Sequence, residues 1–266
     1  VAVEIIRNGS RGMVWLEPLV EVVTDAGRMG FGPMTVADVP ALFGGLGRHA
    51  KALGPVEDLP WMKGQTRLTF ARVGVVDPVS LADYRAHGGM VGLDRAKSMT
   101  PAQIVTEVTE SGLRGRGGAG CPTGIKWKTV SEAKADRKYI VCNADEGDSA
   151  TFADRMLMEG DPFTLIEGMA IAGLACGAAK GFVYIRSEYP VAIRVMQDAV
   201  RIAREEGLLD ARFDIEIRVG AGAYVCGEET SLLNSLEGKR GVVRAKPPLP
   251  ALEGFMGKPT VVNNVI

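Results

Sequence analysis

Apolar runs alternate with amphipathic stretches in the second half of the chain. Apolar runs at 138–143, 181–185 and 213–219 predict three strands. Between them, an Ala- and Gly-rich segment at 162–176 and an amphipathic segment at 190–206 predict two helices. Strands and helices that alternate at these lengths indicate βαβ units and therefore an α/β fold with a parallel sheet.

The first 99 residues give weaker signals. Strand-like runs separated by turn residues occur at 3–6, 14–23 and 29–32. A helix start is predicted at Thr35. We interpret residues 1–45 as a small α/β domain or half of one. Residues 46–99, with three prolines and weak periodicity, are interpreted as a connecting region with a short strand at 67–76.

The clearest helix start lies at Thr100. The sequence Thr-Pro-Ala-Gln is a capping box with proline at the first helical position, and we expect the helix to end at Ser111. A loop with four glycines in six positions follows at 115–120, with Arg116 inside it and Lys126 shortly after. Glycine has no side chain to bury, so this run indicates a sharp bend or a close approach.

The charge of the glycine loop predicts that it wraps an anionic group, most often a phosphate. Its spacing differs from that of a P-loop and is a weak match to G-x-G-x-x-G. Two predicted strands lead into further loops rich in glycine and carboxylates, at 143–148 and 220–229. In parallel sheets ligands bind beyond the carboxyl ends of the strands. These loops therefore carry the candidate site.

Each of these residues has a structural alternative. Glu228 and Glu229 are also typical first-turn charges of a helix, and a short acidic run such as 145–148 is often a solvated turn. Tyr224 alone suits a half-buried core position, and Lys246 before two prolines suits a linker. The functional interpretation depends on the occurrence of all these motifs together.

Composition narrows the class of protein. The 266 residues are 46% hydrophobic and 24% charged, which favours a globular chain of one large or two ordinary domains. The formal net charge of −1 gives no support for nucleic-acid or direct membrane partners. No apolar run is long enough to span a bilayer. The chain starts without methionine, and we expect it to be part of a longer protein.

The chain has four cysteines, Cys121, Cys142, Cys176 and Cys226. None forms a C-x-x-C pair, which argues against a zinc or iron–sulfur site within these residues. The last three lie among apolar or small neighbours, so we expect buried thiols. Reduced thiols and the absence of a secretory signal predict a cytoplasmic protein.

Three motifs together identify a family. Three segments resemble the NADH-binding flavoprotein subunit of respiratory NADH dehydrogenase. They are the glycine loop with its continuation to Trp127, the segment from Asn143 to Arg155, and the segment from Gly220 to Thr230. Segments 246–248 and 257–264 add two further matches, and the resemblance covers residues 100–266. Diaphorase subunits of soluble hydrogenases and formate dehydrogenases share this module.

The resemblance implies a Rossmann-like parallel sheet that binds FMN and NAD(H). Hydride passes between the two cofactors, and FMN then passes single electrons to iron–sulfur clusters. No side chain is required as a catalytic group, although Glu229 is implied to support the hydride transfer. The implied FMN residues are Gly115, Arg116, Gly117, Gly118, Lys126, Asn143, Asp145, Glu146, Tyr224, Gly227, Glu228, Asn263 and Asn264. The implied NAD residues are Cys121, Asp148, Tyr224, Glu229 and Lys246.

This chain departs from the family pattern at three positions. Cys121 and Thr129 stand where the family usually has aromatic residues that stack on adenine. We expect their absence to weaken nucleotide binding by roughly 1 kcal/mol or more. Asp148 stands where a glutamate is common, so its contact is expected to be shorter or bridged by water.

The first 45 residues resemble the tail of the thioredoxin-like domain that binds a 2Fe-2S cluster in a companion subunit. No cysteine precedes Cys121, so they cannot hold such a cluster. A fused domain without a cluster resembles the β subunit of soluble NAD-dependent molybdenum formate dehydrogenase. The implied partners are a thioredoxin-like 2Fe-2S γ subunit and a molybdenum- and cluster-containing α subunit.

Two other interpretations stay open. One is the equivalent subunit of a hydrogenase or of respiratory NADH dehydrogenase, and the other is an assembly scaffold without cofactor. In the flavoprotein interpretation, the full-length subunit is expected to carry one 4Fe-4S cluster whose ligands lie beyond these residues.

Overall fold

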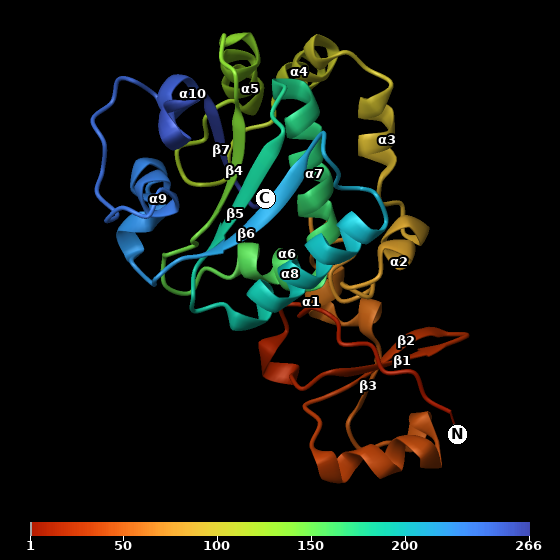
Figure 1. The fold of residues 1–266 in the computed structure, drawn as a ribbon. Helices are drawn as coiled ribbons and strands as arrows, with labels where there is room; N and C mark the ends of the chain where they lie inside the picture. The colour runs from red at the N-terminus through yellow and green to blue at the C-terminus, as the bar shows by residue number, and fades with distance from the viewer. Residues whose placement is uncertain (1) are drawn as a thin grey trace. The chain divides into compact units, whose positions relative to one another are not determined.

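The computed structural model describes residues 2–266, which form two compact units (Figure 1). The smaller unit spans residues 10–71, and the larger comprises residues 2–9 and 72–266. The division into 1–45, 46–99 and 100–266 and the thioredoxin-like identity of residues 1–45 stay predictions. None of the helices within residues 2–266 is both long and apolar enough to cross a bilayer.

The smaller unit is built on an antiparallel sheet in the order β1-β2-β3. Its strands are β1 (Val20–Thr24), β2 (Gly27–Phe31) and β3 (Ala52–Pro55). The helical segments are η1 (Val14–Leu16), η2 (Val36–Gly44), η3 (Leu46–Arg48), η4 (Val56–Asp58) and α1 (Pro60–Lys63). Met13, Val56 and Met62 form its core. The predicted helix start is confirmed, because Thr35 and Asp38 form a capping box.

Three strand predictions in this part of the chain were wrong or too long. Residues 3–6 are exposed and lie outside any strand, because their apolar side chains have no sheet to pack on. The predicted run at 14–23 contains a 3-10 turn before β1 begins at Val20. Residues 67–76 form turns and bends rather than a strand.

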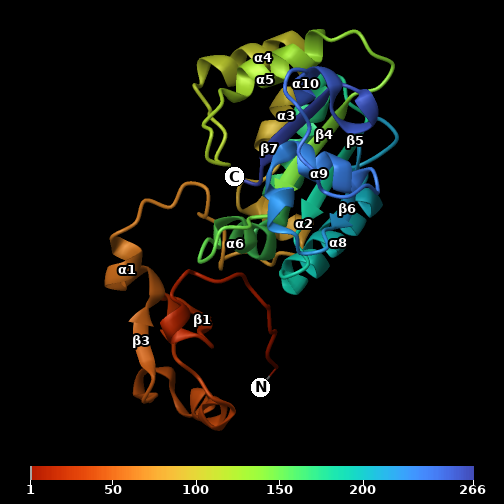
Figure 2. The ribbon, with the colours of Figure 1, turned by 90° about the vertical axis from the view of Figure 1, so that its left-hand side faces the viewer.

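The larger unit contains a four-stranded sheet in the order β6-β5-β4-β7, with every neighbouring pair parallel (Figure 2). The strands are β4 (Tyr139–Ala144), β5 (Lys180–Ile185), β6 (Asp214–Val219) and β7 (Thr260–Asn264). The first three confirm the predicted strands and the parallel α/β class. The sequence analysis noted the last only as part of a motif.

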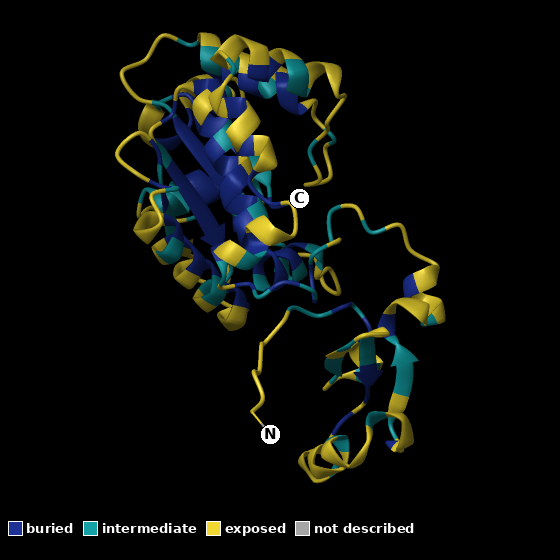
Figure 3. Cartoon of the chain, turned by 90° about the vertical axis from the view of Figure 1, so that its right-hand side faces the viewer, coloured by how far each residue is buried: buried dark blue, intermediate teal, exposed yellow. Residues whose placement is uncertain are grey.

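Helices cover both faces of this sheet, whose strands β4, β5 and β7 are largely buried, whereas the edge strand β6 is partly exposed (Figure 3). The helices α5 (Thr123–Glu132), α7 (Pro162–Cys176) and α8 (Pro190–Glu205) pack against strands of the sheet. The helix α9 (Glu229–Leu236) packs Leu232 and Leu233 against the alternate residues Tyr139, Val141 and Phe182. Because successive side chains of a strand point to opposite faces, α9 lies across the sheet from α7.

Shorter helices complete the larger unit. They are α2 (Leu81–Ala86), α3 (Val91–Lys97), α4 (Pro101–Glu110), α6 (Ala153–Gly160), η5 (Tyr224–Gly227), α10 (Pro250–Glu253) and η6 (Phe255–Gly257). The capping box at Thr100 is confirmed, since Thr100 and Gln103 bond reciprocally. Four of the helices were not predicted: α2 and α3 lie in the predicted connecting region, and α5 and α6 lie within glycine- and acid-rich motifs.

The strand order creates a switch point at the centre of the sheet. From β4 the chain moves outward through β5 to β6, and it then returns across the sheet so that β7 pairs with the other side of β4. Ligands of open α/β sheets bind where the strand order reverses, beyond the carboxyl ends. Asn143 and Asn264 are register partners at that point.

Candidate functional site

A cavity of about 770 Å³ opens at the carboxyl ends of β4 and β7. Its walls come from four stretches of the chain that are far apart in sequence. They supply Arg116, Gly117, Gly118, Asn143, Glu146, Gly147, Asp148, Thr151, Ala153, Asp154, Tyr224, Val225, Gly227, Glu228, Asn264 and Ile266. A second cavity of about 600 Å³ lies among α4, α5 and the end of α7 and contains none of the predicted site residues.

The glycine loop leaves open space beside the cavity. Its two ends are joined by a bridge between Arg114 and Pro122 and by a hydrogen bond from Gly115 N to Cys121 O at 2.9 Å. A Cβ added at Gly117 would meet only the Cβ of Asn264, at 4.0 Å. At Gly118, where φ is +101°, nothing lies within 4 Å of such an atom. The loop can therefore place its backbone directly against a ligand.

Glu146 organises the loop that follows β4. Its φ of +36° turns the chain, and its carboxylate accepts hydrogen bonds from Asp154 N at 2.8 Å and Arg155 N at 3.1 Å at the start of α6. The hydroxyl of Tyr189 donates to the same carboxylate at 2.9 Å. The Arg186 guanidinium donates to the Glu146 carbonyl oxygen at 2.5 Å. Glu146 is thus a fixed anion at the cavity wall.

Two other carboxyl groups near this wall are buried. Burial raises the pKa of Asp145 to about 6, although Arg186 opposes this shift. Burial, and then the charge of Glu146, raises the pKa of Asp154 to about 7. Both acids are therefore protonated far more readily than an exposed aspartate.

Glu228 connects the cavity to the start of α9. Its carboxylate accepts hydrogen bonds from Thr230 N at 2.8 Å and Ser231 N at 2.9 Å, which makes it the N-cap of the helix. Lys246 Nζ lies 2.9 Å from Glu228 and 2.8 Å from Glu229. Although burial opposes ionisation, the hydrogen bonds from Thr230 and Lys246 lower the pKa of Glu228 to about 2.

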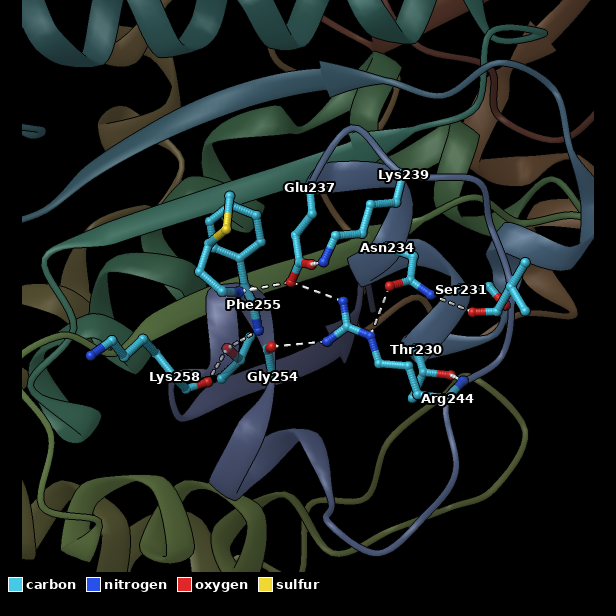
Figure 4. Close-up of polar contacts among 12 residues, drawn as sticks. Thr230, Ser231, Asn234, Glu237, Lys239, Arg244, Gly254, Phe255 and Lys258 are labelled. Carbon is cyan, nitrogen blue, oxygen red and sulfur yellow. Dashed lines mark hydrogen bonds and ion pairs between the residues drawn. The ribbon is translucent and has the colours of Figure 1, made fainter.

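A polar network behind α9 fixes the segment that carries Lys246 (Figure 4). The Arg244 guanidinium lies 2.8 Å from the Glu237 carboxylate and donates to Asn234 Oδ1 at 2.9 Å and to Gly254 O at 3.0 Å. The side chain of Glu237 is only 4% exposed. These contacts connect the loop between α9 and β7 to residues of α9 and to Gly254.

The structure brings most of the predicted site residues to one cavity. Of the predicted FMN set, nine line it: Arg116, Gly117, Gly118, Asn143, Glu146, Tyr224, Gly227, Glu228 and Asn264. Asp148, from the predicted NAD set, lines it as well. Glu229 and Lys246 are linked to this wall through Glu228.

Besides Glu229 and Lys246, five predicted residues lie outside the cavity lining. Gly115 and Cys121 form the neck of the glycine loop, and Cys121 is exposed. The side chain of Lys126 is directed to Val262 O at 2.6 Å, and Asn263 accepts a hydrogen bond from Trp127 at 3.0 Å. Asp145 is buried behind the wall, with its carboxylate beside Gly147 and Gly227.

Six lining residues lie outside the predicted site set, and Asp154 is the most notable of them. The others are Gly147, Thr151, Ala153, Val225 and Ile266. Asp154 belongs to the motif segment from Asn143 to Arg155, whose residue pattern does not single it out. Cys142, Cys176 and Cys226 are buried, as predicted, and burial raises the pKa of the Cys176 thiol to about 12. Within residues 2–266, no cluster of His, Cys, Asp and Glu side chains could hold a metal ion.

Comparison with known proteins agrees with this geometry. HndC, which belongs to an NADP-reducing hydrogenase from Solidesulfovibrio fructosivorans, is 54% identical over 210 residues, which cover 76% of this chain and 43% of the relative. An NADH-quinone oxidoreductase subunit from Aquifex aeolicus (strain VF5) is 50% identical over 193 residues, which cover 70% of this chain and 45% of the relative. The chain thus spans less than half the length of these relatives.

A solved structure of NAD+-reducing NiFe-hydrogenase in the air-oxidized state gives the same result. It superposes with a TM-score of 0.63 at 33% identity, and the match covers 91% of this chain and 42% of the hydrogenase chain. Residues 108–266 match the family described as the Nuo51 FMN-binding domain. Since this match covers more than half of the chain, and the cavity lies within it, the chain belongs to the Nuo51 FMN-binding domain family.

Proposed function

We propose that this chain is the FMN- and NAD(H)-binding module of a diaphorase, which moves hydride between NAD(H) and FMN and passes electrons singly to iron–sulfur clusters held elsewhere. The observation that carries the proposal is that nine of the thirteen predicted FMN residues line one cavity within the family match. When bound, FMN supplies the exchange between two-electron and one-electron transfer.

The residues of the cavity suit a flavin nucleotide. Open space beside Gly117 and Gly118 lets a flat ring lie against the backbone. Arg116 offers positive charge to a phosphate. The amides of Asn143 and Asn264 each keep a second N–H, beyond those bonded to Gly227 O and Asp154, for polar ring or sugar atoms. We assign FMN binding to Gly115, Arg116, Gly117, Gly118, Lys126, Asn143, Asp145, Glu146, Tyr224, Gly227, Glu228, Asn263 and Asn264.

The outer side of the cavity suits a dinucleotide. We assign NAD(H) binding to Cys121, Asp148, Tyr224, Glu229 and Lys246. Lys246 offsets part of the negative charge of two neighbouring carboxylates, which weakens their repulsion of the diphosphate. The bond from Tyr224 OH to Asp148 fixes the aromatic ring at the cavity mouth.

An absorbance spectrum of the purified full-length protein tests the function. We expect a flavin spectrum that NADH bleaches under anaerobic conditions. A folded protein with no flavin, and no binding of added FMN, would contradict the proposal and favour a cofactor-free scaffold. Glu229→Ala is expected to slow flavin reduction by NADH while FMN stays bound, and unchanged reduction would contradict the placement of Glu229.

The finer proposal concerns the complex. We infer that this module belongs to the β subunit of a cytoplasmic NAD-dependent molybdenum formate dehydrogenase. The full-length β subunit would carry a 4Fe-4S cluster. Its partners would be a 2Fe-2S γ subunit and a molybdenum-containing α subunit. Residues 1–45 without cysteine support this proposal. The names of the relatives support the alternatives, a hydrogenase or an NADH-quinone oxidoreductase. Metal analysis of the purified complex distinguishes these alternatives. We expect molybdenum, and nickel would contradict the formate dehydrogenase proposal.

A further inference from the structure

We propose that Asp154 is a protonated acid on the wall of the flavin cavity that donates its hydrogen to FMN, so that FMN binding takes up a proton. This inference rests on the assignment of the cavity to FMN. It adds to that assignment a residue outside the predicted site set and a dependence on pH.

The placement of Asp154 supports a role toward the ligand. It is the second residue of α6, it lines the cavity, and it is only 4% exposed. Asn264 Nδ2 donates to Asp154 Oδ2 at 2.9 Å, and Asn264 Oδ1 accepts from Ile266 N at 3.0 Å. Both polar atoms of the Asn264 amide are thus engaged, which fixes the amide and orients the carboxyl group.

The surroundings of Asp154 disfavour its charged form. Glu146 lies beside it and receives three donors, among them the backbone N–H of Asp154 itself. Its negative charge and the burial of Asp154 both favour a proton on Asp154. Asn264 supplies a single hydrogen bond, which does not compensate a buried anion.

The other charged and titratable groups near Asp154 do not reverse this balance. Arg155, next to it on α6, is held by the Glu159 carboxylate at 2.9 Å. Cys142 on β4 is buried, and burial raises the pKa of its thiol. The Tyr189 hydroxyl on α8 donates to Glu146. Arg116, from the glycine loop, lines the same cavity, where we assign it to the phosphate.

A neutral acid differs from a carboxylate in what it offers a ligand. With Oδ2 accepting from Asn264, the hydroxyl of the protonated group is a donor for a carbonyl oxygen or ring nitrogen. Ionised Asp154 would have no hydrogen to donate and would repel the FMN phosphate. FMN therefore binds the protonated form, and above the pKa of Asp154 binding requires proton uptake.

The experiment measures FMN affinity of deflavinated full-length protein from pH 5.5 to 8.5 by quenching of flavin fluorescence. We expect the FMN affinity of the wild type to fall as the pH rises above about 7. For each pH unit, this fall should exceed that of Asp154→Asn by a factor of up to about ten. Asp198→Asn is the control, because it removes an exposed carboxylate of α8 that does not line the cavity, and it should keep the wild-type slope. Equal slopes for wild type and Asp154→Asn would overturn the proposal.

A second measurement uses the unaltered protein, in case Asp154→Asn does not fold. Calorimetric titration with riboflavin, which has no phosphate to titrate, is performed at pH 8 in buffers of different ionisation enthalpy. We expect uptake of up to about one proton per flavin. Binding without proton uptake would overturn the proposal, whereas failure of both flavins to bind at any pH would contradict the flavin function itself.

Discussion

The hydroxyl of Tyr224 donates to Asp148 Oδ1 at 2.7 Å and so joins the loop after β6 to the loop after β4 across the cavity. The bond to the carboxylate raises the pKa of the tyrosine. Tyr224 is 70% exposed, so this contact contributes little to the free energy of unfolding. Its position at the cavity mouth indicates a role in binding.

Tyr224→Phe is expected to weaken dinucleotide binding without loss of the fold. The variant keeps the ring but frees Asp148, so we expect the KM for NADH to rise by up to about tenfold. The free energy of unfolding should change by less than about 0.5 kcal/mol. Steady-state kinetics and urea denaturation measure the two quantities. A large loss of stability with an unchanged KM would show that the contact is structural.

Lys246→Met is expected to raise the KM for NADH severalfold. Glu228 and Glu229 would lose the cation that they share, the pKa of Glu228 would rise from its value of about 2, and uncompensated charge would repel the diphosphate. Lys246→Arg keeps the charge and should retain a KM near that of the wild type. Equal effects of both substitutions would contradict an electrostatic role.

Asp154→Asn is expected to change how the stability of the deflavinated protein depends on pH. The folded state raises the pKa of Asp154 from 3.8 to about 7, so between these values it binds more protons than the unfolded state. This contribution to stability is therefore present at low pH and declines as the pH rises to about 7. The variant lacks that decline.

The stability of Asp154→Asn relative to that of the wild type should thus increase between pH 5 and pH 8, by about 1 to 3 kcal/mol. Urea denaturation at the two pH values measures this difference. A constant difference between the two proteins would indicate that Asp154 is charged throughout.

Gly117→Ala is expected to impair FMN binding and to leave the fold intact. The new Cβ has room in the protein, since its nearest neighbour is 4.0 Å away, but it takes space beside the cavity. We expect the dissociation constant of FMN to rise at least about tenfold, which corresponds to about 1.4 kcal/mol.

Gly124→Ala is the matched control. Its Cβ would lie 2.2 Å from Thr109 Oγ1 and 2.6 Å from Thr109 Cα, where α4 and α5 meet. We expect a loss of about 1 to 3 kcal/mol of stability from this clash. Thermal unfolding and FMN titration separate the two effects. Loss of stability in Gly117→Ala would show that this glycine serves packing.

Local signals explain which elements the sequence analysis found. The strands β4, β5 and β6 are short apolar runs between helices, and α4 has a capping box, so each is encoded within a few residues. The helices α5 and α6 were missed because their sequences begin in glycine and acidic loops. In such segments tertiary contacts outweigh local propensity.

Long-range contacts explain why some predicted site residues lie outside the cavity. Lys126 and Asn263 are motif residues of the right kind, yet they bond to Val262 and Trp127 rather than line the cavity. Periodicity cannot predict this, because the direction of a polar side chain depends on which groups the packed helices bring near it.

By itself the sequence determined the parallel α/β class, the family, and the three loops that build the cavity, because each of these is expressed in local residue patterns. Only the tertiary structure decided that β7 pairs with β4, which places Asn264 at 2.9 Å from Asp154 although the two are 110 positions apart. The order of strands follows from the packing of helices on both faces of the sheet. That packing also buries Asp154 beside Glu146, and so raises the pKa on which proton-coupled FMN binding depends.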